Sequence, residues 1–227
     1  MRAKDDWIEV LYKIVGDGMR LLSSARPGDS ISVIGPIGQS FRTMPERPKT
    51  LLIGGGVGIP PMIFIADHLR RQSDDWQPLA ILGSEIPFPF KLRPSNIEVP
   101  GVDLDINSTM PLLEGWGVPC RLTTRAGYDG CFDGYVTDLA DKWLATLSVD
   151  DLHRTAVFAC GPTPMLKAVA ALAERYDIPC QVSLEEFMAC AVGGCAGCAV
   201  KIKTPGGEAM RRVCIDGPVF DAATVVW

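Results

Sequence analysis

The chain has 227 residues, 47% of them apolar and 22% charged, which is the composition of an ordinary globular protein. Its net charge of −5 excludes the basic surface that nucleic-acid binding requires, so no nucleic-acid partner is expected. The two histidines, His68 and His153, stand far apart in unrelated contexts, which disfavours a histidine-based metal or acid–base site.

The sequence predicts a cytoplasmic protein that does not enter the membrane. The first residues are charged and contain no apolar core, so they are not expected to act as a signal peptide. The longest apolar run, 51–66, contains four glycines and two prolines and is too short and broken to cross a bilayer.

The N-terminal part has the pattern of a β-hairpin. Strands are predicted over 7–15 and 30–34, with a short helix over 19–24 and a turn over 26–29 between them. A hairpin of this size is not stable alone, so it must pack on another part of the chain.

Strands and helices alternate after a linker at 46–49. This alternation predicts a parallel sheet covered by helices, with ligands at the carboxyl ends of its strands. Strands are expected over 50–53, 79–83, 102–107, 121–124 and 156–159, and helices over 60–72, 136–143 and 163–176.

Two turns in this region are candidates for nucleotide binding. The first carries Gly54, Gly55, Gly56 and Gly58 between a strand and a helix, where a backbone without side chains can approach a pyrophosphate. Because Ile59 occupies the place of the third glycine, the turn departs from the G-x-G-x-x-G fingerprint. Alone it is a weak signal, since many glycine-rich turns bind nothing.

The second turn also joins a strand to a helix, and it contains Cys160, Gly161, Pro162 and Met165. If the sheet is parallel, both turns face one crevice at its carboxyl edge. Taken alone, Cys160 is equally well explained as a buried thiol at the end of a strand.

Four of the eight cysteines crowd into the last 38 residues, with the spacing Cys190-x4-Cys195-x2-Cys198-x15-Cys214. This spacing is typical of plant-type [2Fe–2S] clusters. Structural zinc is an alternative, although zinc sites usually show two C-x2-C pairs. Disulfide bonds are a third alternative, which the lack of an export signal disfavours. The scattered cysteines, Cys120, Cys131 and Cys180, are expected to be ordinary core residues.

The segment from about residue 181 is rich in Gly, Cys and Ala and has few large apolar residues, so a metal cluster is expected to hold it together. Gly193, Gly194 and Gly197 suit a tight loop around such a cluster. Ser183 and Glu186 form a capping-box pattern, which predicts a short helix leading into the loop.

The two nucleotide turns together resemble those of the ferredoxin–NADP reductase superfamily. The stretch from Ser183 to Cys198, followed by Arg212 to Phe220, resembles the electron-transfer subunits of class 1B dihydroorotate dehydrogenase, and the likeness extends from about Trp7 to Trp227. It implies an α/β fold in three parts: a truncated flavin-binding β-barrel over 1–45, a parallel-sheet NAD-binding domain over 46–180 and a small [2Fe–2S] domain over 181–227.

The resemblance implies an oxidoreductase subunit of pyrimidine biosynthesis. Electrons from the FMN of a dihydroorotate dehydrogenase catalytic subunit would cross the [2Fe–2S] cluster to FAD and then reach NAD⁺, in a heterotetramer with two copies of each chain. No residue of this chain is expected to be catalytic. The residues that would contact the flavin are Leu11, Tyr12, Lys13, Gly18 and Met19, while the two turns would bind NAD and the four tail cysteines the cluster.

Three departures from the family pattern lead to alternative hypotheses. The early Arg-Pro-x-Ser/Thr flavin segment is missing, Met19 replaces a threonine, and Thr124-Arg125-Ala126 replaces an acidic pair. A cation at Arg125 would favour a 2′-phosphate on the nucleotide. The alternatives are a reductase subunit of another flavin and iron–sulfur oxidoreductase, resembling those of hydrogenases or glutamate synthase, and a truncated relay module without flavin.

Overall fold

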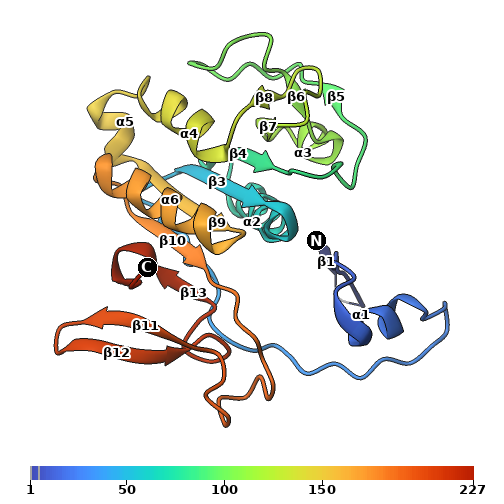
Figure 1. The fold of residues 1–227 in the computed structure, drawn as a ribbon. Coiled ribbons are helices and arrows are strands. Elements are labelled where there is room, and N and C mark those ends of the chain that lie inside the picture. Colours follow the sequence, from blue (N-terminus) through green and yellow to red (C-terminus); the bar gives the residue numbers. More distant parts are fainter. Residues whose placement is uncertain (1, 5) are drawn as a thin grey trace.

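The computed structural model describes residues 2–4 and 6–227, with side chains from residue 6 onward. A seven-stranded sheet forms its centre, parallel except at one edge, as the alternation of strands and helices predicted. The order across the sheet is β13 (Val219–Asp221), β10 (Cys180–Ser183), β9 (Thr155–Cys160), β3 (Lys49–Gly55), β4 (Gln77–Gly83), β7 (Cys120–Thr124) and β8 (Phe132–Asp133) (Figure 1).

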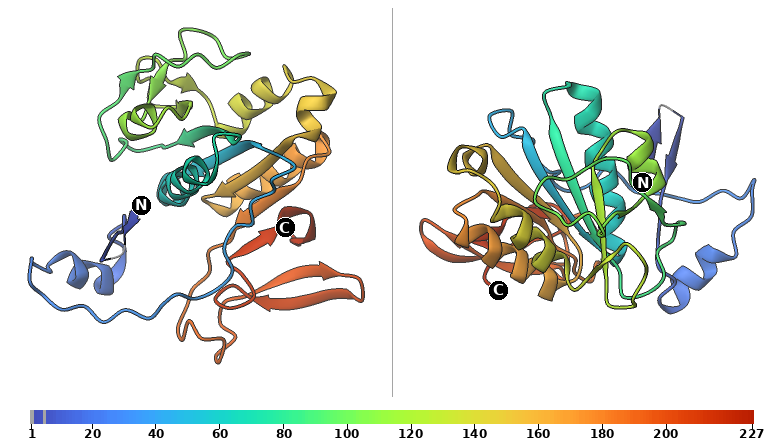
Figure 2. Two further views of the ribbon diagram at one scale, coloured as in Figure 1. Left: turned by 180° about the vertical axis from the view of Figure 1, so that it is seen from behind. Right: turned by 90° about the horizontal axis from the view of Figure 1, so that it is seen from above.

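Helices cover both faces of this sheet because its central strands are apolar on both sides. In β3, Leu52 packs on one face, whereas Leu51 and Ile53 pack on the other. Figure 2 shows the two helical layers on opposite sides of the strands. The first layer contains α2 (Ile59–Gln72) and α3 (Pro111–Gly115), and the second contains α4 (Val136–Leu144), α5 (Val149–His153) and α6 (Thr163–Arg175).

The N-terminal part is only sparsely packed. It forms a hairpin of β1 (Arg2–Lys4) and β2 (Trp7–Glu9), followed by α1 (Gly16–Ser23). The strand predicted over 30–34 is not formed, and the one predicted over 7–15 ends at Glu9. No described strand lies beside 30–34, and its apolar side chains are largely exposed, so the alternating pattern has no partner on which to pair.

The C-terminal tail leaves the sheet and returns to it. It contains a hairpin of β11 (Ala199–Thr204) and β12 (Gly207–Arg212), then β13 and the short 3-10 helix η2 (Ala222–Thr224). The helix predicted from the capping box is not formed. Ser183 is the last residue of β10, where it pairs with Cys160 on one side and Val219 on the other, and an extended residue in a ladder cannot cap a helix.

The strand predicted over 102–107 is also absent, and two aspartates in it disfavour a strand. Instead, β5 (Arg93–Pro94) pairs with β6 (Ser108–Thr109) beside it. The remaining strands and helices predicted between 50 and 176 are confirmed, with ends shifted by a few residues. Among the described residues, every helix is too short or too polar to cross a membrane.

Candidate cluster and nucleotide sites

The two predicted nucleotide turns lie side by side. Strands β3 and β9 are parallel neighbours with Gly54 opposite Cys160, so their carboxyl ends emerge together. The 3-10 turn η1 (Gly56–Gly58) then crosses the end of β9. A Cβ atom on Gly58 would lie 1.9 Å from the carbonyl oxygen of Cys160, so glycine is required there by the closeness of the two backbones.

Side chains and helix ends complete this crevice. A Cβ on Gly55 would lie 2.5 Å from Sδ of Met165, which packs the second turn against the first. Each turn leads directly into a helix, α2 or α6, with proline in its first turn. Two helix N-termini, each with unpaired N–H groups, therefore lie side by side at one edge of the sheet, and helix N-termini favour the binding of a pyrophosphate.

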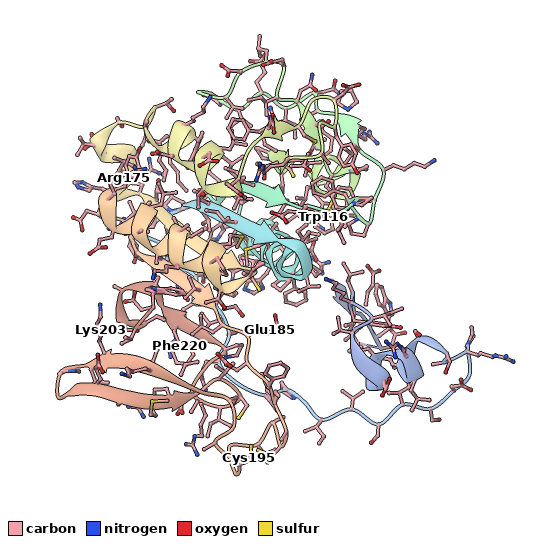
Figure 3. All side chains as sticks on the ribbon, viewed as in Figure 1. Trp116, Arg175, Glu185, Cys195, Lys203 and Phe220 are labelled. Carbon is pink, nitrogen blue, oxygen red and sulfur yellow. The ribbon has the colours of Figure 1, made fainter. Side chains whose placement is uncertain are left out.

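The loop over 184–198 has no regular structure and turns sharply around its cysteines. Ala191, Gly193 and Ala196 have positive φ angles of 57°, 80° and 55°. Two of these residues carry a side chain, so the surrounding contacts must hold them in a conformation that only glycine adopts freely. Cys195 lies at the outer end of this loop, away from the sheet (Figure 3).

The four tail cysteines are arranged as two pairs. The backbone N–H of Cys195 donates to Sγ of Cys190 at 3.4 Å, and the two thiols lie within hydrogen-bond reach of each other. Cys198 and Cys214 form the second pair, buried behind the first. The backbone N–H of Gly197 donates to Sγ of Cys195 at 3.4 Å, so amides point at the sulfurs, as a bound cluster requires.

The backbone amides favour thiolates in this loop. The N–H groups of Cys195 and Val192 lower the pKa of Cys190 to about 6. The N–H of Cys214 lowers the pKa of Cys198, whereas burial and then the neighbouring Cys198 thiol raise that of Cys214. Adjacent thiolates repel, and this repulsion opposes ionisation of both members of the buried pair. Metals bind the thiolate form of cysteine, so the lowered pKa values of Cys190 and Cys198 favour metal binding in this loop.

The other four cysteines have the opposite environment. Burial raises the pKa of Cys120 to about 11 and raises the pKa values of Cys131, Cys160 and Cys180 as well. Such thiols remain protonated and chemically inert. The thiol of Cys160 is in addition hydrogen-bonded to Ser183 beside it in the sheet.

The pairing suits a cluster of two irons, whereas tetrahedral zinc needs four ligands at one point. A [2Fe–2S] cluster needs two thiolates at each of two irons, and the two pairs Cys190/Cys195 and Cys198/Cys214 fit that requirement.

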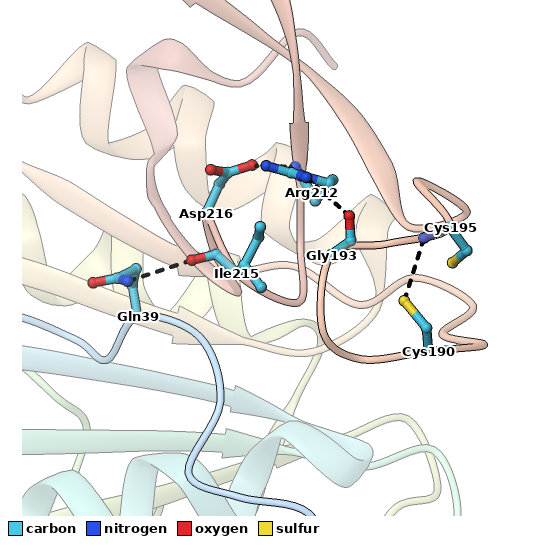
Figure 4. Close-up of polar contacts among 7 residues, drawn as sticks. All are labelled: Gln39, Cys190, Gly193, Cys195, Arg212, Ile215 and Asp216. Atoms are coloured by element: carbon cyan, nitrogen blue, oxygen red, sulfur yellow. Dashed lines mark hydrogen bonds and ion pairs between the residues drawn. The ribbon is translucent and has the colours of Figure 1, made fainter.

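Two anchors of the loop gave no signal in the sequence. Gln39 donates from its side chain to the carbonyl oxygen of Ile215 at 3.3 Å, and Arg212 donates to that of Gly193 at 2.9 Å (Figure 4). These contacts join segments that are remote in sequence, so no local spacing of residues predicts them. The proximity of Arg212 to Cys214 was the one available hint.

The residues expected to contact a flavin lie in the N-terminal part. Leu11, Tyr12 and Lys13 follow β2, and Gly18 and Met19 lie in α1. Figure 1 shows α1 on the side of the sheet where β3 and β9 end. Leu11 and Met19 are half-buried and the other three are exposed.

Arg125 follows the carboxyl end of β7 at the same sheet edge. Its Nη1 donates to Tyr135 Oη at 3.0 Å, and the guanidinium carbon lies 5.6 Å from the centre of the Tyr135 ring. Among the described residues, it has no carboxylate within ion-pair distance. Because β7 is two strands from β3, this cation lies about 10 Å across the sheet from the glycine turn.

The tail matches a known family. The family model described as the iron–sulfur cluster binding domain of dihydroorotate dehydrogenase B matches residues 185–226, which include the four tail cysteines. A relative from Caldanaerobacter subterraneus subsp. tengcongensis, named as the electron transfer subunit of dihydroorotate dehydrogenase B (NAD(+)), is 32% identical over 99% of this chain and 77% of its own. One from Geobacillus thermodenitrificans with the same name is 35% identical over 96% of this chain and 73% of its own.

A solved structure has a similar fold. It is described as an NADH-dependent reduced ferredoxin-NADP oxidoreductase and superposes with a TM-score of 0.70 and 27% sequence identity. The match covers 95% of this chain and 67% of the other, so it includes both the sheet and the tail.

Replacing Cys195 with serine is expected to abolish cluster binding, because one iron would lose a thiolate and its loop a fixed point. Iron content, the visible spectrum and protease resistance of 181–227 are the measurements. Cys131→Ser, outside the loop, should leave all three unchanged. A Cys195→Ser chain with the iron content of the parent would show that the ligand set is wrong.

Replacing Gly58 with alanine is expected to push the two nucleotide turns apart. The added methyl group overlaps the Cys160 carbonyl oxygen, so the free energy of unfolding should fall by about 1–3 kcal/mol and dinucleotide affinity should fall with it. Gly115→Ala is the control, because a Cβ there meets nothing within 4 Å. Thermal unfolding and calorimetric NADH titration test both variants, and equal affinities would contradict the assignment of the crevice.

Proposed function

This chain belongs to the family of dihydroorotate dehydrogenase B electron-transfer subunits, and from that premise we propose that it carries electrons from a catalytic partner subunit to NAD⁺. The observation that carries the proposal is the match of residues 185–226 to the family's cluster-binding domain, combined with the two pairs of thiols in that segment. The electrons would come from dihydroorotate oxidation in pyrimidine biosynthesis.

Three groups belong to this function: a [2Fe–2S] cluster, FAD and NAD. When bound, the cluster handles single electrons and the flavin joins them to the two-electron hydride chemistry of the nicotinamide. The chain's own contribution is positional. Cys190, Cys195, Cys198 and Cys214 would hold the cluster, the glycine turn after β3 and the turn after β9 would together hold the dinucleotide, and residues 11–13 and 18–19 would contact the flavin.

The exposed side of the cysteine loop suits a docking partner. Phe187 is 94% exposed and Val192 is 62% exposed, and both belong to the loop that carries the exposed Cys195. Several exposed apolar side chains on one loop are a candidate docking surface. We assign this side to the FMN-containing catalytic subunit, in an assembly with two copies of each chain, because electron transfer requires the donor to approach the cluster closely.

The test is reconstitution with the catalytic subunit. The complex, loaded with cluster and flavin under anaerobic conditions, is expected to form NADH when dihydroorotate is added, and a complex containing the Cys195→Ser chain is not. A chain that copurifies with zinc and lacks visible absorption would refute the cluster. Specific capture of a hydrogenase or glutamate synthase subunit instead would refute the choice of partner.

Arg125 is expected to let the site accept a 2′-phosphorylated nucleotide as well as NAD. Among the described residues its guanidinium group has no carboxylate partner, and it follows β7 at the sheet edge that carries the glycine turn. Arg125→Gln should weaken NADPH binding about tenfold, the effect of one hydrogen bond to a charged group, and leave NADH binding unchanged. Arg93→Gln, which removes an exposed cation in β5, controls for net charge. Equal losses for both nucleotides would contradict this assignment.

A further inference from the structure

Arg212, the last residue of β12, reaches across to the cysteine loop. Its Nη1 donates a hydrogen bond of 2.9 Å to the carbonyl oxygen of Gly193, which lies between Cys190 and Cys195 in the chain. Its Nε lies 3.4 Å from Oδ2 of Asp216, so the carboxylate holds the guanidinium group in this orientation (Figure 4).

The backbone of Arg212 is fixed by the same turn. Its N–H donates to Oδ2 of Asp216 at 2.8 Å. Its carbonyl oxygen accepts from the N–H groups of Ile215, Asp216 and Gly217 at 3.2, 2.8 and 3.2 Å. A residue with this many backbone contacts cannot shift without moving Cys214, which lies inside the turn.

The turn is also held from the N-terminal side. The backbone N–H of Gln39 donates to the carbonyl oxygen of Gly217 at 2.5 Å, and its side chain donates to that of Ile215. A Cβ on Gly38 would lie 2.4 Å from the Gly217 carbonyl oxygen, which shows how closely the two segments meet. Arg212 therefore projects from a firmly anchored base.

The loop fits closely onto this base. Gly193 is buried with a φ of 80°, and a Cβ on it would lie 2.5 Å from Cδ1 of Ile215 and 3.4 Å from Nη1 of Arg212. The loop thus meets an apolar side chain and a cation at one point, and no larger residue would fit there.

We propose that Arg212 is a positioning residue of the cluster site, which clamps the loop at the Gly193 carbonyl between Cys190 and Cys195 and places a positive charge at that point. The inference rests on the proposed function, since it requires a cluster on these thiols. The clamp slows loss of the cluster, because outer contacts that orient ligands strengthen metal retention. The charge stabilises the reduced cluster, which holds one more electron, and so raises its reduction potential.

Two substitutions of Arg212 distinguish its effect on cluster retention from its effect on the reduction potential. Arg212→Gln removes the charge and the fork of donors. Arg212→Lys keeps the charge but has a single ammonium group, which cannot contact the Gly193 carbonyl and the Asp216 carboxylate with the same geometry. Arg211→Gln is the matched control, because it removes an exposed cation one residue away, opposite Val200 in the hairpin.

The experiment uses the full chain with its cluster assembled anaerobically. Bleaching by an iron chelator measures retention, and a redox titration followed by electron paramagnetic resonance measures the potential. Arg212→Gln should lose its cluster about tenfold faster than Arg211→Gln and have a more negative potential. Arg212→Lys should lose it faster than the parent while its potential stays near that of the parent.

An equal potential in Arg212→Gln and Arg211→Gln would overturn the inference, because both variants lose one positive charge and only Arg212 contacts the loop between Cys190 and Cys195. If Arg212→Gln does not fold, Arg212→Lys decides: bleaching at the parent rate would overturn the clamp. A parent chain that takes up zinc and no cluster would overturn the proposed function itself, and this outcome is distinct from a parent with a cluster that Arg212 does not affect.

Discussion

In the proposed site four thiols must be held around one inorganic core, and three of them stand on a loop that has almost no apolar core of its own. Between 184 and 198 the buried residues are Leu184, Gly193 and Cys198, which is too few to fix the shape by packing. The loop therefore depends on its ends. The sheet fixes one end at Ser183 and the turn over 212–217 fixes the other, and between them backbone N–H groups are directed at sulfur.

The same sheet sets the distance between the two sites. Strand β10 is the parallel neighbour of β9, and its last residue, Ser183, lies opposite Cys160. The cysteine loop therefore begins where the second nucleotide turn begins. In the proposed function the cluster and the nicotinamide nucleotide exchange electrons through a flavin, and this shared edge holds the cysteine loop and the nucleotide turns on one sheet. A domain boundary after residue 180 would divide β10, and β13 of the tail pairs with β10. The tail and the nucleotide-binding part therefore share one sheet.

The N-terminal part joins this frame through a few residues. Phe41 packs on Phe158 with ring centres 5.4 Å apart, and Arg42 exchanges two backbone–side-chain hydrogen bonds with Gln181. With Gln39 on the turn after Cys214, these contacts touch the sheet and the tail within four positions of the chain. The residues before them bury little apolar surface.

The sequence by itself determined the parallel sheet, the two turns at its edge and the set of candidate thiols. These features are local: a strand–helix alternation, a glycine run and the x4/x2 spacing each describe neighbouring residues. Only the tertiary structure decided that Ser183 is extended, that 30–34 has no strand partner and that Arg212 holds the cysteine loop. The reason is that strand pairing, and a hydrogen bond such as that from Arg212 to Gly193, join segments whose proximity no local pattern encodes.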